Sequence, residues 1–213
     1  MNISTKQLLI IFIPIILITA GFFYVNYLQY KPLYPEPKTK KEQISKIPIF
    51  PGDVILGKKE VPKTIVIFED LSCAACKQQQ KILDKLIKKH PNQVKVIWKG
   101  LPIKKFPFSS EKAHKYAFCV SKQNKFKEFM KLAFANSDNL RTAILEEIIK
   151  QMDLNQNRLQ SCLQRNKAQQ YIDRTKKLAK LLNIQSVPAV FLNGEQIKAP
   201  ETLIQWETKL NLN

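Results

Sequence analysis

Two cysteines three residues apart, Cys73 and Cys76, are the side chains in this sequence best suited to chemistry. Such a pair can open and close a disulfide, and the attacking species in that exchange is a thiolate. Half of a zinc site is an alternative, as is a structural disulfide. Zinc needs further ligands, however, and the chain has only two other cysteines, distant in sequence, and two histidines. The pattern favours redox chemistry.

The residues around this pair predict a strand followed directly by a helix. Residues 64–68 form a short apolar and β-branched run, which is typical of a strand buried on both faces. From Cys73 onward the residues favour a helix, and Ser72 is the expected N-cap. Both cysteines then lie on a first helical turn, whose unpaired N–H groups favour the thiolate of Cys73.

Two motifs together resemble a known family. The first, Phe-x-Asp-x-x-Cys-x-x-Cys, begins at Phe68, and the second, Val-Pro-Ala-Val-Phe-Leu-Asn-Gly, occupies residues 187–194. They resemble the DsbA-like family of thioredoxin-fold oxidoreductases, over about residues 52–210. The resemblance implies a cis Val187–Pro188 peptide beside the cysteines that helps to bind substrate, and no metal or organic cofactor. A trans proline at the start of an edge strand is the alternative.

The remaining pattern agrees with an α/β fold. Residues 94–98 alternate as a second strand, so that strand, helix and strand form a βαβ unit with parallel pairing. Residues 109–183 are helical in pattern, and residues 201–210 predict a last helix. The expected fold is a thioredoxin fold over residues 52–213 with an inserted helical subdomain.

Cys119 and Cys162 both fall in the helical region. They resemble the cysteine pair that part of the DsbA-like family joins in a structural disulfide. Two free buried thiols are the alternative.

Two acidic residues and the two histidines differ in what they could do near the cysteines. Glu69 and Asp70 lie close to them in sequence and are candidates for a proton relay to Cys76, with two exposed turn carboxylates as the alternative. His90 and His114 occupy the positions of a loop residue and a helix-surface residue, and neither has a case as a ligand or base.

The direction of electron flow stays open. Where the family often has proline and then a histidine, this chain has Ala74 and Ala75, which supply no imidazolium to stabilise the Cys73 thiolate. An oxidase of exported proteins with free thiols is the first hypothesis, and the resemblance then implies a quinone-linked membrane redox partner. A reductase or isomerase, and a non-enzymatic metal or assembly chaperone, are the alternatives.

The N-terminal region predicts a membrane anchor. Residues 8–25 carry no charge and are just long enough to span a bilayer, so residues 1–29 are expected to form a transmembrane signal anchor. A cleaved signal peptide is the alternative. Residues 30–51 read as a linker rich in proline and lysine. Lysines after the apolar run oppose export by the positive-inside rule, but the resemblance places the domain on the extracytoplasmic side of a bacterial membrane.

The chain is strongly basic, with 35 Lys+Arg against 17 Asp+Glu and a net charge of +18. The lysines are spread along the chain and no nucleic-acid-binding motif accompanies them. The composition therefore favours a solvated lysine-rich surface over nucleic-acid binding.

Overall fold

The computed structural model describes residues 5–30 and 47–212. The chain divides into two compact units, residues 1–35 and 36–213. The first unit contains helix α1 (Thr5–Tyr30), which has a proline, Pro14, in its interior.

The expected transmembrane helix is not confirmed. Among the described residues, no helix combines the length and the apolar character that crossing a membrane requires. Most of the expected linker, residues 31–46, lies outside the described residues. The last residues assigned to the linker pack on the domain, since Ile47 is buried and the ring of Phe50 lies 4.2 Å from the Nζ atom of Lys99.

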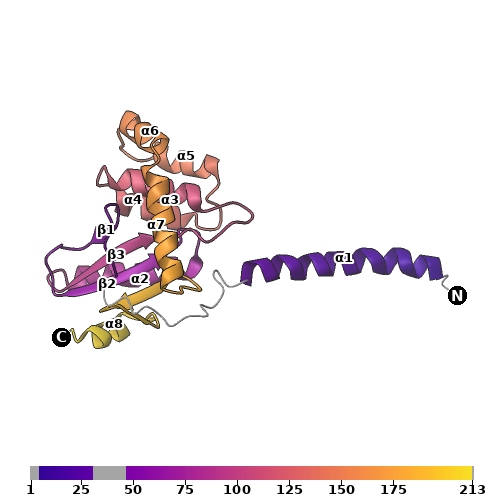
Figure 1. Ribbon diagram of the computed structural model, residues 1–213, viewed down its shortest axis with the longest axis horizontal. Helices are drawn as coiled ribbons and strands as arrows, with labels where there is room; N and C mark the ends of the chain where they lie inside the picture. The colour runs from indigo at the N-terminus through magenta and orange to yellow at the C-terminus, as the bar shows by residue number, and fades with distance from the viewer. Residues whose placement is uncertain (1–4, 31–46, 213) are drawn as a thin grey trace. The chain divides into compact units, whose positions relative to one another are not determined.

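The second unit has five strands and seven helices among its described residues. In chain order they are β1 (Val54–Leu56), β2 (Lys63–Glu69), α2 (Ala74–Lys89), β3 (Val94–Gly100), α3 (Glu111–Ser121), α4 (Phe126–Ala135), α5 (Thr142–Lys150), α6 (Gln156–Gln164), α7 (Lys167–Leu181), β4 (Ala189–Leu192), β5 (Glu195–Ile197) and α8 (Leu203–Leu210). The strands form one sheet in the order β1-β3-β2-β4-β5 (Figure 1).

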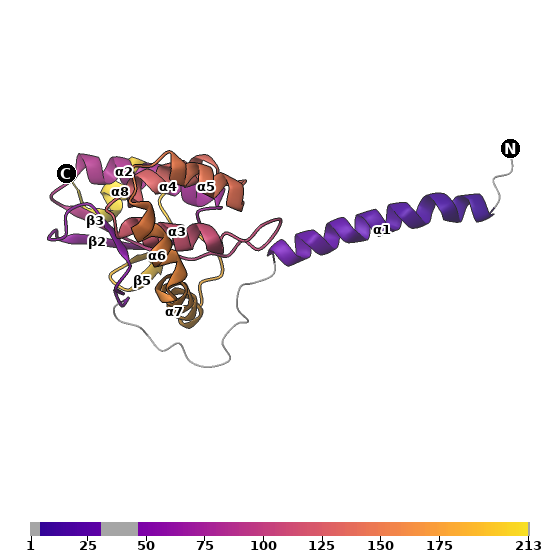
Figure 2. The ribbon, with the colours of Figure 1, turned by 90° about the horizontal axis from the view of Figure 1, so that it is seen from above.

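The central pair of the sheet is the predicted βαβ unit. β2 and β3 run parallel, and the neighbouring pairs are antiparallel. Figure 2 shows α2 and α8 on one side of the sheet and α7 on the other, so the central strands are covered on both faces. This double burial explains the nearly continuous apolar run of β2.

The two helices on the first face are joined by a histidine. His90 caps the C-terminus of α2, and its Nε2 atom lies 2.7 Å from Oε1 of Glu207 on α8. His90 lies just beyond the last residue of α2, as expected for a loop residue, but its side chain is buried. The tertiary contact with α8, more than a hundred residues away in sequence, could not be read from the local pattern.

The helical subdomain is inserted between β3 and β4, as predicted. Helices α3 to α6 gather toward one end of the sheet, and α7 runs back along one of its faces (Figure 1). Cys119 on α3 and Cys162 on α6 form a disulfide with a Cα–Cα distance of 5.7 Å, which is the pairing that the resemblance implied. The disulfide fastens the outer helix α6 to α3, which packs against α7.

The far face of the sheet contains a buried ion pair that the sequence did not predict. Lys99 on β3 is fully buried and pairs with Asp53, whose side chain is also buried. The hydroxyl of Tyr171 on α7 donates a hydrogen bond to Asp53 Oδ1 at 3.0 Å. A charge in this position is tolerated because it is paired and hydrogen-bonded. The pair fixes the chain before β1 on the sheet.

Candidate active site

Cys73 is itself the N-cap of α2. Its Sγ atom accepts a hydrogen bond from the backbone N–H of Cys76 at 3.1 Å. The expected cap, Ser72, has a buried hydroxyl with no hydrogen-bond partner among the described residues, so that expectation is wrong. The helix starts later than expected because the carboxylate of Asp70 accepts a hydrogen bond from the N–H of Ser72 at 2.9 Å.

The two thiols have opposite electrostatic environments. Hydrogen bonding with the Cys76 side chain, helped by the N–H groups of the first turn, lowers the pKa of Cys73 below its usual value against the opposing effect of burial. Burial raises the pKa of Cys76 well above its usual value, and the hydrogen bond with the Cys73 side chain and the nearby Glu69 carboxyl group add to this effect. Cys73 is half-buried and Cys76 is fully buried. Cys73 is therefore the sulfur that attacks or is attacked.

Sheet pairing brings the second motif to the cysteines. β4 runs antiparallel to β2, with Ala189 opposite Phe68, so the residues before β4 lie beside the residues that follow β2. The Val187–Pro188 peptide is cis, as the resemblance implied. The thiol of Cys73 donates to the carbonyl oxygen of Val187 across 3.6 Å.

Asp70 acts as an anchor. Its side chain is fully buried, and besides the N–H of Ser72 it accepts hydrogen bonds from the N–H groups of Ile103 at 2.7 Å and Lys104 at 2.9 Å. The hydroxyl of Ser110 donates to it at 2.7 Å. Burial raises its pKa, but these bonds and His114 outweigh burial and lower the pKa to about 2. A carboxylate with this pKa and this many fixed donors is suited to holding loops and poorly suited to carrying protons.

His114 lies inside the domain, and its prediction as a helix-surface residue is wrong. It is buried on α3, with its Nε2 atom 3.3 Å from Asp70 Oδ1 and its ring stacked on Trp98. Gly100 makes room for this arrangement, because a Cβ atom there would lie 2.5 Å from His114 Nδ1. The only sequence signal was an apolar helix face that could include position 114.

Glu69 is buried without a hydrogen-bond partner. Both of its carboxyl oxygens lack one among the described residues, and its exposed fraction is 0%. Burial raises its pKa well above the usual range, an effect that the neighbouring Trp98 side chain only partly offsets. Glu69 also lies close enough to Cys76 to raise the pKa of that thiol. Glu69 therefore remains the candidate for a proton relay to Cys76. The alternative, that Glu69 and Asp70 are exposed turn carboxylates, is wrong because both side chains are buried.

Comparisons with known proteins agree with this architecture. A thioredoxin family model matches residues 50–211. Among solved structures, the chain is similar to a thioredoxin-like oxidoreductase from Silicibacter pomeroyi, with a TM-score of 0.68, 20% identity and coverage of 76% of this chain and 92% of that one. It is also similar to the thiol-disulfide exchange protein alpha-DsbA2 from Wolbachia pipientis, with a TM-score of 0.66, 21% identity and coverage of 74% and 84%.

A curated relative is much longer than this chain. The Na(+)/H(+) antiporter NhaA 3 of Salinispora tropica is 26% identical over 155 residues, which are 72% of this chain and 24% of that protein. The chain thus spans about a quarter of the length of that relative.

Because the family model covers most of the chain and the insertion of α3 to α7 matches the expected arrangement, the chain belongs to the thioredoxin family and has its DsbA-like form.

Proposed function

We propose that the protein is a thiol:disulfide oxidoreductase that transfers the Cys73–Cys76 disulfide to protein thiols. One observation carries the proposal: the Sγ atom of Cys73 receives the first-turn N–H of Cys76 and faces the carbonyl of Val187, while Cys76 is fully buried. Stabilisation of the Cys73 thiolate stabilises the reduced site, and this makes the disulfide a better oxidant. The oxidase direction follows from that stabilisation.

The exchange proceeds in two steps. A substrate thiolate attacks Cys73 Sγ, the bond between the two cysteine sulfurs breaks, and Cys76 leaves as a thiolate that takes up a proton. A second substrate thiolate then attacks the substrate sulfur of the mixed disulfide, and Cys73 leaves as a thiolate. The substrate gains a disulfide and loses two electrons, which the reduced Cys73–Cys76 pair retains.

Glu69 supplies the proton in the first step. Burial raises the pKa of Glu69 and so favours its protonated form, and burial also raises the pKa of Cys76, so the acid can pass a proton to the departing thiolate. Asp70, in contrast, stays ionised and holds the loop. Val187 and Pro188 form the wall against which the extended substrate backbone lies, next to Cys73.

Two variants test the exchange. The full chain is oxidised and mixed with a peptide that contains two thiols. Cys76→Ser, with Cys73 first activated as a mixed disulfide with 5-thio-2-nitrobenzoate, is expected to exchange that leaving group for a peptide with a single thiol and to retain the peptide at Cys73. Cys73→Ser is expected to trap none and to lose at least a thousandfold in oxidation of the peptide with two thiols. Mass spectrometry after alkylation measures both the mixed disulfide on the protein and the oxidation of the peptide. The proposal fails if Cys73→Ser retains peptide oxidation or if Cys76→Ser traps no peptide.

The location and partners belong to the same proposal. Residues 8–25 carry no charge, and a disulfide such as Cys119–Cys162 suits an oxidising compartment, so we place the domain outside a bacterial cytoplasmic membrane with the N-terminal segment as its anchor. Exported proteins with free thiols are then the substrates, and a quinone-linked membrane protein reoxidises the pair. Labelling of intact cells with a thiol reagent that does not cross membranes checks this. A Cys73 that reacts only after lysis would contradict it.

A further inference from the structure

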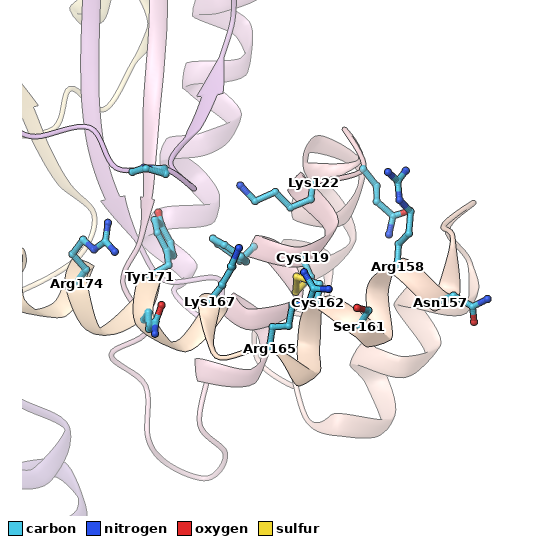
Figure 3. A pocket seen from close by; sticks show the side chains of 14 residues that line it. Cys119, Lys122, Asn157, Arg158, Ser161, Cys162, Arg165, Lys167, Tyr171 and Arg174 are labelled. Atoms are coloured by element: carbon cyan, nitrogen blue, oxygen red, sulfur yellow. A yellow bond between two sulfur atoms is a disulfide. The ribbon is translucent and has the colours of Figure 1, made fainter.

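A pocket of about 770 Å³ lies between the C-terminal end of α3, helix α6 and the start of α7 (Figure 3). It is separate in sequence from every residue of the proposed exchange site, and its size is that of a small-molecule site. The Cys119–Cys162 disulfide forms part of its wall, which fixes α3 and α6 relative to each other.

The charge of this pocket is entirely positive. Five basic residues line it, namely Lys122, Arg158, Arg165, Lys167 and Arg174, and no acidic residue does. Figure 3 shows that they come from three separate elements. Within the described part of the chain none of the five forms an ion pair. Elsewhere on the surface, lysines such as Lys125 and Lys198 lie beside glutamates.

Arginine is concentrated at this pocket. The chain has 35 Lys+Arg, but only four are arginine, and three of those four line the pocket. Arginine presents a planar fork that binds phosphate oxygens in pairs, which lysine does not. Aromatic rings orient two of the cations, since Lys122 lies 4.8 Å from the centre of the Phe118 ring and Arg174 lies 5.4 Å from that of Phe50.

In the described domain no acidic side chain lies within ion-pair distance of these five charges. The acidic group nearest in the chain to the wall residue Pro51 is Asp53, and its carboxylate is already occupied by Lys99 and Tyr171. Five like charges around one cavity repel one another and favour a bound anion. The amide of Asn157 and the hydroxyl of Ser161 add neutral donors for its oxygens.

The geometry points to a binding site for a multiply charged phosphate group in this pocket. The phosphate belongs to a soluble phosphate compound or to the headgroup of an anionic lipid, and both offer the same oxygens. This inference is independent of the exchange chemistry at Cys73.

Titration calorimetry of the full chain with inorganic pyrophosphate tests the site. The source is distinguished by the pelleting with phosphatidylglycerol vesicles in excess of that with neutral phosphatidylcholine vesicles, which corrects for insertion of the N-terminal segment. Arg158→Gln/Arg165→Gln is compared with Lys85→Gln/Lys209→Gln, which removes the same charge from two exposed lysines outside the pocket. We expect saturable binding that the arginine pair variant weakens at least tenfold and the lysine pair variant less than twofold. Arg158→Lys/Arg165→Lys should recover only part of the loss.

Each outcome decides the inference. Selective loss of pyrophosphate binding supports a soluble phosphate, and selective loss of vesicle binding alone supports a lipid headgroup. Equal weakening in both double variants would show attraction by net charge only and would overturn the site. Absence of saturable binding to both probes would overturn it as well.

Discussion

The two cysteine pairs of this domain are built in opposite ways. Cys73 and Cys76 are free thiols at the start of one helix, three residues apart, with pKa values moved in opposite directions. Cys119 and Cys162 are 43 residues apart and already joined, so that they hold α3 and α6 together. Reactivity depends on asymmetry between two thiols, whereas stabilisation depends on the length of chain that a bond closes.

Their surroundings extend the contrast. The thiol pair has two adjacent buried carboxyl groups beneath it, Asp70 with many donors and Glu69 with none. The Cys119–Cys162 disulfide, in contrast, borders a pocket whose lining includes no acidic residue. The four predictions below use these differences, in order of expected effect on stability or potential.

Removal of the structural disulfide is expected to cost the most stability. Cys119→Ala/Cys162→Ala removes a bond between residues that are 43 positions apart in sequence. By the chain-entropy account, closing a loop of this length raises the free energy of unfolding by about 4 kcal/mol. Urea unfolding of the full chain measures this loss. Peptide oxidation by the folded variant should stay within twofold of the unmodified protein. A folded variant that loses activity would show that this pair takes part in exchange.

Loss of the Asp70 anchor is expected to have the next largest effect. Asp70→Asn removes a carboxylate whose pKa is lowered from 3.8 to about 2, so it should destabilise the domain by about 2 kcal/mol at pH 7. Because the folded pKa is the lower one, this contribution is present above about pH 4 and disappears as the pH falls to about 2. The variant should therefore show a shallower loss of stability in acid.

The matched control for this prediction is Ser72→Ala, which removes a neighbouring hydroxyl that accepts and donates nothing in the described structure. Its stability should keep the acid dependence of the unmodified protein. An Asp70→Asn variant with the same acid dependence would contradict the assignment of that carboxylate as an anchor.

Replacement of Glu69 should have a smaller effect of the opposite sign. Its folded pKa is raised, so its burial costs more as the pH rises above the pKa of the unfolded chain. Glu69→Gln does not ionise and is expected to stabilise the domain at pH 7 by about 1 kcal/mol, with a gain that grows between pH 5 and 7. Peptide oxidation should slow severalfold. An unchanged rate of peptide oxidation would show that Glu69 is not the proton donor to Cys76.

Much of the fold could be predicted because the signals are local. The apolar run of β2, the alternation in β3 and the Asn193–Gly194 turn between β4 and β5 each depend on a few adjacent residues. The cis Val187–Pro188 peptide and the Cys119–Cys162 pairing came from the resemblance, which carries information about tertiary structure that residue patterns lack.

The buried polar groups could not be predicted in the same way. Charged residues at a strand end usually face solvent, yet Asp70 meets Ser110 and His114 from α3 and its N-terminal turn, some 40 residues later. Lys99 alternates with apolar neighbours, and its partner Asp53 lies 46 residues earlier. Such partners are fixed by packing, so only the structure shows that these charges are internal.

The central claim, that the site gives its disulfide away, is tested most directly by the reduction potential of the Cys73–Cys76 pair. The full chain is equilibrated in glutathione and dithiothreitol buffers, alkylated and digested, and the fraction oxidised is read from the peptide that contains both cysteines. We predict a potential above about −180 mV, in the range of disulfide donors. A value near about −270 mV, as in thioredoxin, would contradict the account and indicate a reductase.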